Sequence, residues 1–312
     1  MVLPRADDFT REKVELGKRL FFDPILSLHR DISCASCHQP ELAFSDGLRQ
    51  AKGLGQLDRN TPSLINVGFL HKGILWDGSI PDLESQVLHS VRNPLEMGLS
   101  WPAACHRITG KKDYKKSFRK IYGDESLDSV MVASVLAHFQ RTLIGNRSRY
   151  DQVMAGKGSF TPAEKRGWTI FFDADPKLPS GECAHCHTDP LFTDGSFQNN
   201  GLVSSRDMKD VRVDPGRSQY TGNLNDRFLF KVPSLRNVAI TAPYMHDGRM
   251  KTLREVLLHY NMGGNPGYNV SPNVRPLKFS DADMDDLTAF LHTLTDAEYL
   301  KSKSQLKWQF PR

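Results

Sequence analysis

The sequence lacks long apolar stretches: no run approaches the ~18 residues that a helix needs to span a bilayer. Its first residues, MVLPRADDFTREK, carry closely spaced charges and have no apolar segment of the kind found in secretory leaders. We therefore expect either a cytosolic protein or one whose leader has been removed. With 312 residues, 39% of them hydrophobic and 25% charged, the composition is that of a water-soluble globular chain with about two domains' worth of length.

The sequence also lacks a block of basic residues. Lys and Arg number 41 against 36 Asp and Glu, so the net charge is only +5, and these residues are scattered along the chain. Nucleic-acid binding is therefore not expected, and the small excess fits a weak attraction to an acidic partner.

Cysteine is scarce, but four of the five cysteines form two close pairs. Cys34-Ala-Ser-Cys37-His38 and Cys183-Ala-His-Cys186-His187 both read C-x-x-C-H, which is the attachment motif of c-type haem. Two thiols one helical turn apart can add to the two porphyrin vinyl groups, and the adjacent His then supplies an imidazole nitrogen to iron. The sequence therefore predicts two covalently bound haem c groups, with His38 and His187 as iron ligands.

A redox dithiol or half of a zinc site is the alternative interpretation of one such motif. A zinc site built from both pairs needs only four ligands, so it would leave both trailing histidines unexplained. Because covalent attachment of haem to two cysteines normally takes place outside the cytoplasm, we expect a periplasmic protein without its leader. Cys105 has no partner cysteine and is most simply a buried free thiol.

The two motifs belong to an internal repeat. Matching strings recur in the same order: ELGKRLFF with KRGWTIFF, AFSDG with LFTDG, TPSLINV with VPSLRNV, and WDG with HDG. Each half ends in a stretch with helical spacing of apolar residues, at 129–143 and 283–294. We expect a mainly α fold with long loops and little β structure, made of two cytochrome c-like domains related by duplication, residues 1–157 and 158–312. Thr161, Pro162 and Glu164 predict a capped helix start.

The repeat also predicts that the two irons differ. Asp77 to Leu83 and Asp247 to Leu253 have equal lengths, and the following helix places Tyr260 opposite Ser90. A phenol can ligate iron, whereas the serine side chain is too short. One haem would be closed by two protein ligands and the other open to a small molecule. His259, Met262 and Met245 compete with Tyr260 for this role.

Over nearly its whole length, the chain resembles the bacterial di-haem cytochrome c peroxidase superfamily, which includes MauG. The matching strings are LGKRLFFDPILS, ISCASCHQPELAFSDG, RNTPSLINVGF, WDG, NPLEMG and FKVPSLRNVAITAPYMHDG. The resemblance implies that the first haem reacts with peroxide and that the second stores an oxidising equivalent. Ordinary peroxidases have Met at the position of Tyr260, and MauG has Tyr. A thioether raises the haem potential, whereas a hard phenolate favours ferric and higher states.

The resemblance also implies roles for other residues. Glu96 matches the distal acid–base glutamate, Gln86 a second distal residue, and Trp76 the tryptophan between the haems. One calcium ion is implied, with ligands matching Asn60, Thr241 and Pro243. Residues 51–59 contain no histidine that could close the first haem, so we expect it to be open at rest.

Together these observations predict a periplasmic di-haem peroxidase. It would reduce hydrogen peroxide with electrons from an external donor, a small cytochrome c or a copper protein. One alternative is a MauG-like enzyme that oxidises aromatic residues of a partner protein, and another is a non-catalytic di-haem electron carrier. A homodimer is compatible with the sequence but has no direct support in it.

Overall fold

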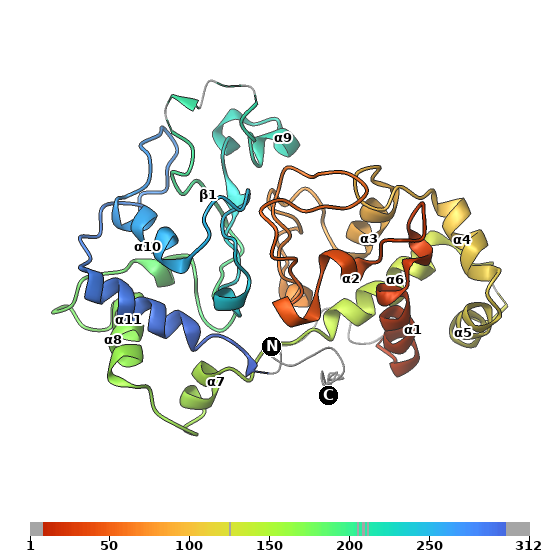
Figure 1. Ribbon diagram of the computed structural model, residues 1–312, viewed down its shortest axis with the longest axis horizontal. Coiled ribbons are helices and arrows are strands. Elements are labelled where there is room, and N and C mark those ends of the chain that lie inside the picture. The colour runs from red at the N-terminus through yellow and green to blue at the C-terminus, as the bar shows by residue number, and fades with distance from the viewer. Residues whose placement is uncertain (1–8, 125, 205, 208–209, 211, 298–312) are drawn as a thin grey trace. The chain divides into compact units, whose positions relative to one another are not determined.

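The computed structural model describes the chain except for residues 1–8, 125, 205, 208–209, 211 and 298–312 (Figure 1). The described part is mainly helical, as the sequence predicts, and its one sheet pairs the two-residue strands β1 (Phe197–Gln198) and β2 (Phe230–Lys231) antiparallel. Within the described residues, no helix combines the length and the apolar character that a membrane span requires.

The chain forms two compact units. Over the described residues, the first comprises 9–71 and 80–144, and the second comprises 72–79 and 145–297. This division differs from the expected boundary after residue 157 in two ways. Helix α7 (Arg149–Met154) belongs to the second unit, and so does the short segment 72–79, which carries Trp76.

The first unit is built on helices α1 (Arg11–Phe22) and α6 (Ser129–Arg141), which pack against each other. Gly17 allows this close approach, because a Cβ atom there would lie 1.8 Å from the carbonyl oxygen of Val135. The remaining helices of this unit are α2 (Cys34–Cys37), α3 (Leu83–Arg92), α4 (Trp101–Thr109), α5 (Lys112–Tyr122) and the short 3-10 helices η2 (Pro24–Leu26), η3 (Pro40–Leu42) and η4 (Val67–Phe69).

A buried ion pair fixes α3 against α6. The Arg141 guanidinium donates from Nη1 and Nη2 to the two carboxylate oxygens of Glu84, at 2.8 and 2.9 Å. Their side chains are only 6% and 13% exposed, so water screens this two-bond pair weakly. The position of α3 matters because it carries Gln86 and Ser90.

The second unit repeats this packing with α8 (Pro162–Phe171) and α11 (Asp281–His292). The predicted start of α8 is confirmed: the Thr161 side chain accepts from the Glu164 N–H, and Pro162 occupies the first turn. Phe171, Phe192 and Phe290 form the centre of the core. The other helices are α7, α9 (Ser218–Thr221), α10 (Leu253–Asn261) and the 3-10 helices η5 (Cys183–His185), η7 (Leu224–Asp226) and η8 (Val238–Ile240).

Replacing Gly167 by Ala is expected to lower the free energy of unfolding by about 1–3 kcal/mol, the usual cost of overpacking. The added Cβ would lie 2.0 Å from the Asp286 carbonyl oxygen and would push α8 away from α11. Urea unfolding followed by far-UV circular dichroism measures the change. Gly158→Ala is the matched control, since its Cβ meets nothing within 4 Å. Equal stability of the two variants would contradict the prediction.

Candidate haem sites

The first C-x-x-C-H motif forms helix α2, with His38 at its C-cap. The His38 N–H donates to the Cys34 carbonyl at 2.9 Å, so the short turn itself places the imidazole. Its Nδ1 atom donates to the Phe44 carbonyl at 2.8 Å, which leaves Nε2 free to ligate a metal. Burial lowers the pKa of His38, which favours the neutral ring that a ligand must be.

The acceptor for His38 is held in place by the core. Phe44 has a left-handed backbone, with φ of 60°, and its fully buried ring packs edge-on against Phe21 at 6.0 Å. The turn therefore directs a backbone carbonyl at the imidazole while the side chain anchors the turn.

The second motif makes the same two histidine hydrogen bonds, although its backbone forms the 3-10 helix η5 and not an α-helix. The His187 N–H donates to the Cys183 carbonyl at 2.9 Å, and its Nδ1 atom donates to the Phe192 carbonyl at 3.0 Å. Phe192 again has a positive φ, 54°, and is fully buried. Burial lowers the pKa of His187 as well. Each unit thus presents one imidazole whose Nδ1 atom is held by the carbonyl of a buried phenylalanine.

The four motif cysteines are free thiols in the structure. Burial raises the pKa of Cys34 and of Cys183 to about 12, and that of Cys37 to about 11. A redox dithiol requires the opposite shift, since it reacts as the thiolate. Among the described residues, the cluster with metal-ligand spacing contains no cysteine. Both observations count against the redox-dithiol and zinc interpretations of the motifs.

Tyr260 lies on α10, next to the second motif. Burial raises the pKa of the Tyr260 phenol, and Cys183 and Cys186 act in the same direction, which reflects their proximity. The Asn200 amide nitrogen lies 3.3 Å from the Tyr260 hydroxyl and 3.4 Å from the Met245 sulfur. One amide group thus contacts two candidate iron ligands, Tyr260 and Met245.

The other two candidates are placed differently. His259 is 7% exposed, and its Nε2 atom is bonded to the Asn200 carbonyl at 2.9 Å. Met262 is 70% exposed. Tyr260 and Met245 are therefore the two candidate ligands whose oxygen and sulfur atoms lie at the Asn200 amide nitrogen.

Glu96 lies near the first motif. Its negative charge acts to raise the pKa of Cys34, Cys37 and His38, which requires it to be close to them. The Asn93 amide donates to its carboxylate at 2.8 Å, and the His89 Nε2 atom lies 3.9 Å from the same oxygen. With 25% of its side chain exposed, Glu96 is neither sealed in the core nor a freely solvated charge.

Gln86 has a buried oxygen that lacks a donor. Its Nε2 atom donates to the Ser90 hydroxyl at 2.8 Å, whereas its Oε1 atom has no hydrogen-bond partner among the described residues. An unsatisfied buried acceptor costs about 1–3 kcal/mol. We therefore expect a group outside this chain to supply the donor.

The loop of residues 51–59 supports Glu96 through backbone contacts, a feature that the sequence interpretation missed. The Leu54 N–H donates to the Glu96 carbonyl at 3.0 Å, and the Gly55 N–H to the Leu95 carbonyl at 2.9 Å. A Cβ atom on Gly53 would lie 2.5 Å from that Leu95 oxygen. The two closely spaced glycines were the available signal, because they permit backbone to lie directly on backbone.

Trp76 lies in the second unit, where its carbonyl accepts from the Lys231 N–H at 2.7 Å and its side chain is partly buried. Of the predicted calcium ligands, Asn60 belongs to the first unit, and its side-chain nitrogen donates to the Leu48 carbonyl at 2.7 Å. Thr241 and Pro243 belong to the second unit. The relay role of Trp76 and the calcium site remain predictions.

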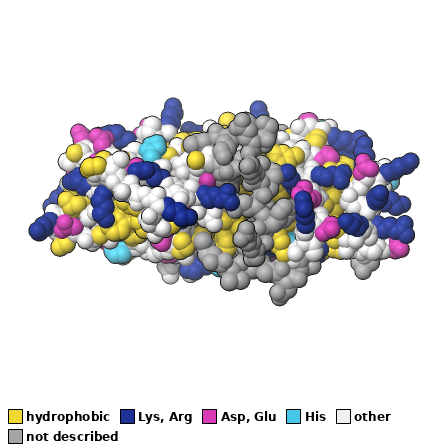
Figure 2. Space-filling view, turned by 90° about the horizontal axis from the view of Figure 1, so that it is seen from below, with side chains coloured by type: hydrophobic (Ala, Val, Ile, Leu, Met, Phe, Trp, Pro, Cys, Tyr) yellow, Lys and Arg dark blue, Asp and Glu magenta, His cyan; other side chains and the backbone are white. Residues whose placement is uncertain are grey.

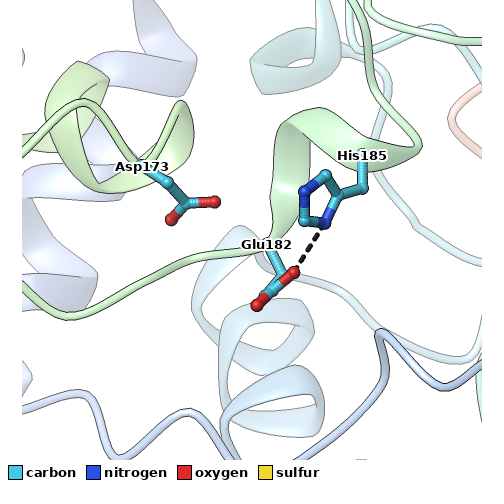
Figure 3. Close-up of side chains that lie close together, drawn as sticks. All are labelled: Asp173, Glu182 and His185. Carbon is cyan, nitrogen blue, oxygen red and sulfur yellow. Dashed lines mark ion pairs between the residues drawn. The ribbon is translucent and has the colours of Figure 1, made fainter. Parts of the chain in front are cut away.

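Figure 3 shows a further polar cluster at the second motif, formed by Asp173, Glu182 and the motif residue His185. The Glu182 carboxylate has two partners: the His185 Nδ1 atom at 2.5 Å and the Arg275 guanidinium, also at 2.5 Å, on its other oxygen. Arg275 is the main cause of the lowered pKa of Glu182. Because an arginine already occupies this carboxylate, we interpret the cluster as an anchor for the chain before Cys183 and not as a metal site.

The comparisons with known proteins identify the family of the chain. A family model described as di-haem cytochrome c peroxidase matches residues 11–159. The chain is 37% identical to methylamine utilization protein MauG of Methylorubrum extorquens over 93% of this chain and 80% of that protein. It is 31% identical to cytochrome c551 peroxidase of Nitrosomonas europaea over 91% of this chain and 80% of that protein.

Solved structures give the same result. A MauG-like protein associated with microbial copper homeostasis superposes with a TM-score of 0.87 at 32% identity, covering 98% of this chain and 96% of that one. The diheme peroxidase BthA from Burkholderia thailandensis superposes with a TM-score of 0.80 at 27% identity, covering 97% and 91% of the two chains. This chain therefore belongs to the di-haem cytochrome c peroxidase and MauG superfamily, whose members are peroxidase-type oxidoreductases with two haem groups.

Proposed function

We propose that the protein is a periplasmic di-haem c-type peroxidase with an open first haem and a second haem ligated by His187 and Tyr260. The observation that carries this proposal is the asymmetry between the two sites. Beside the second motif, the half-buried Tyr260 phenol accepts from the Asn200 amide, whereas a glutamate lies near the first motif and the Gln86 amide oxygen, on α3 of the same unit, has no partner among the described residues.

The paired geometry of the motifs supports covalent attachment and an origin by duplication. In both, the histidine N–H bonds back to the first cysteine, and Nδ1 bonds to the carbonyl of a buried phenylalanine with a positive φ. The glycines at the α1–α6 and α8–α11 contacts add a second correspondence.

The chain's own residues have separate roles in this proposal. Bound haem would supply the iron and the ring system that peroxide chemistry requires. Glu96 would move a proton from the inner to the outer peroxide oxygen, which favours heterolytic cleavage of the O–O bond. The free acceptor of Gln86 would take a hydrogen bond from peroxide or from water. Ser90 fixes that amide through the 2.8 Å bond to its nitrogen.

The fate of the two oxidising equivalents separates two candidate enzymes. An external donor, a small cytochrome c or a copper protein, would return the electrons in an ordinary peroxidase. In a MauG-like enzyme they would come from aromatic residues of a partner protein. Two observations support this second candidate: the position of Tyr260 beside Asn200, and the 37% identity to a MauG protein. In either case Trp76 would relay charge, and calcium at Asn60, Thr241 and Pro243 would be a structural cofactor.

The test is the reaction of the oxidised holoprotein with stoichiometric hydrogen peroxide, followed by EPR and absorption spectroscopy. We expect one high-spin ferric signal that disappears on peroxide addition without prior reduction. Two low-spin haems that do not react would refute the proposal and support an electron carrier instead. Turnover with a reduced copper protein or cytochrome c then separates a peroxidase from an enzyme that requires a protein substrate.

A further inference from the structure

The segment that carries Trp76 departs from the unit on either side of it in the chain. Residues 72–79 belong to the second unit, although residues 71 and 80 belong to the first. The proposed relay role of Trp76 requires a fixed place for this segment, because transfer between reacting groups depends on their distance and orientation. The groups that hold the segment on the second unit would therefore control the relay.

Three hydrogen bonds from the second unit reach carbonyls of this segment. The Lys231 side-chain amine donates to the Gly73 carbonyl at 3.0 Å, and the Lys231 backbone N–H donates to the Trp76 carbonyl at 2.7 Å. The Arg217 guanidinium donates from Nη1 to the Asp77 carbonyl at 2.9 Å. One residue of β2 thus holds the segment at two points, and Arg217 holds the carbonyl next to Trp76.

The amine of Lys231 lies in an unusual environment for a lysine. Lysine amines generally extend into water, as the basic side chains on the face drawn in Figure 2 do. Lys231 is partly buried, and burial lowers its pKa to about 8, whereas the nearby Asp77 carboxylate acts in the opposite direction. Because burial disfavours the ammonium, filling space in the fold is a poor reason for a lysine here. The bond to Gly73 is what this side chain provides.

The segment is compact, so bonds at a few points fix all of it. A Cβ atom on Gly73 would lie 2.6 Å from the Gly78 carbonyl oxygen, so the two ends of the loop touch. A Cβ atom on Gly78 would lie 2.3 Å from the Phe197 ring, and the Arg217 guanidinium lies over that ring at 4.0 Å. Phe197 pairs with Lys231 in the sheet. The β1–β2 pair and Arg217 therefore form one support for the Trp76 segment.

We infer that Lys231 and Arg217 are positioning residues for Trp76, and that their bonds to its segment set the rate at which charge passes through the indole. This inference rests on the proposed function, in which Trp76 relays electrons. In each transfer the indole would give one electron to the first haem, once peroxide has oxidised that haem, and would take one electron from the second haem. Lys231 and Arg217 exchange no electrons and act only by fixing the backbone around Trp76.

The structural test uses the holoprotein with Lys231 changed to Met, which keeps the apolar stem of the side chain and removes the donor. Gly73 is buried, so its carbonyl would lose this partner and the segment is expected to shift until the oxygen reaches water. We expect hydrogen–deuterium exchange in peptides covering residues 72–79 to become about tenfold faster, the effect of one lost hydrogen bond on local opening. Lys231→Arg keeps a charged donor and is expected to remain close to the wild type. Lys177→Met, at an exposed lysine of the same unit, is the matched control.

The functional test is stopped-flow absorption after one equivalent of hydrogen peroxide. In Lys231→Met the ferric signal of the first haem should disappear at the wild-type rate, because Glu96 and Gln86 lie in the other unit. The spectral change of the second haem should follow about tenfold more slowly, an effect within the range caused by misplacing a reacting group. Lys231→Arg should restore the rate of this second phase. The reduction potential of the second haem should be the same in all variants, since none of them changes a ligand candidate.

Three results would overturn the inference. The first is exchange in Lys231→Met as slow as in Lys177→Met. The second is faster exchange with an unchanged second phase, because the bonds would then stabilise the segment without controlling the relay. The third is a Lys231→Arg protein as impaired as Lys231→Met. Should Lys231→Met fail to fold, Arg217→Met removes the third bond, and the same two changes are expected.

The two measurements also separate this inference from the proposed function. A wild-type holoprotein whose first haem does not react with peroxide would refute the proposed function. The exchange measurement needs no peroxide, so it would still decide whether Lys231 and Arg217 hold the segment. Conversely, a wild type that reacts in both phases, with Lys231→Met unaltered in both, would leave the peroxidase standing and remove the positioning role.

Discussion

Replacing Glu96 by Gln is expected to slow the reaction of the oxidised protein with peroxide by about 10²–10⁴-fold, the usual contribution of a positioned proton-transfer group. The amide has nearly the shape of the carboxylate but cannot take up the peroxide proton. It can still bond to the Asn93 amide group, which now donates at 2.8 Å, so the backbone at residues 93–97 is expected to stay in place. Stopped-flow absorption with excess peroxide measures the rate.

The matched control for this substitution is Glu15→Gln, an exposed glutamate on α1 of the same unit. It makes the same charge change away from the first motif, and we expect it to react at the wild-type rate. The ferric spectra of both variants should match the wild type, because His38 keeps its bond to Phe44. A Glu96→Gln protein that reacts as fast as the Glu15→Gln protein would contradict the acid–base role.

The sequence predicts the features whose chemistry is local. Five consecutive residues define each haem motif, and four residues from Thr161 to Glu164 define the start of α8. In each case the interacting groups lie within about one helical turn of each other, so no knowledge of the tertiary fold is needed. The mainly helical character follows from the apolar spacing along the chain in the same way.

The division into units depends on contacts that the sequence does not display. The glycines at 156 and 158 suggest a boundary, but Tyr150 lies before them and packs in the second core. Its ring meets those of Phe192 at 5.0 Å and Phe290 at 6.1 Å. Side chains distant in sequence therefore decide where the chain changes unit, and a local flexibility signal cannot reveal them.

Contacts between the site residues are likewise not visible in the sequence. The repeat places Tyr260 opposite Ser90, but it gives no hint that Asn200, from a distant loop, contacts both Tyr260 and Met245. Similarly, AFSDG and LFTDG can be recognised as equivalent strings. Their purpose, a left-handed phenylalanine whose carbonyl orients a histidine, becomes visible only in the folded backbone.

Replacing Tyr260 by Met is expected to raise the reduction potential of the second haem by on the order of 0.2 V, a fraction of the ~0.8 V that axial ligands can span. A phenolate stabilises ferric iron, and a thioether stabilises ferrous iron. Burial raises the pKa of the Tyr260 phenol. Ligation to iron would replace the phenol proton, and the Asn200 amide, which already donates to this oxygen at 3.3 Å, could keep that bond. Spectroelectrochemical titration measures the potential.

Two further variants decide between the ligand candidates. Met245→Leu removes the other side chain at the Asn200 amide, and Met262→Leu removes an exposed thioether. If Tyr260 is the ligand, both should keep the wild-type spectrum and potential, while the Tyr260→Met protein should need reduction before it reacts with peroxide. A changed ligand spectrum in Met245→Leu, with Tyr260→Met unaltered, would instead assign the sulfur of Met245 to the iron. The second site would then be that of an ordinary peroxidase, because the harder oxygen ligand that stabilises its oxidised states would be absent.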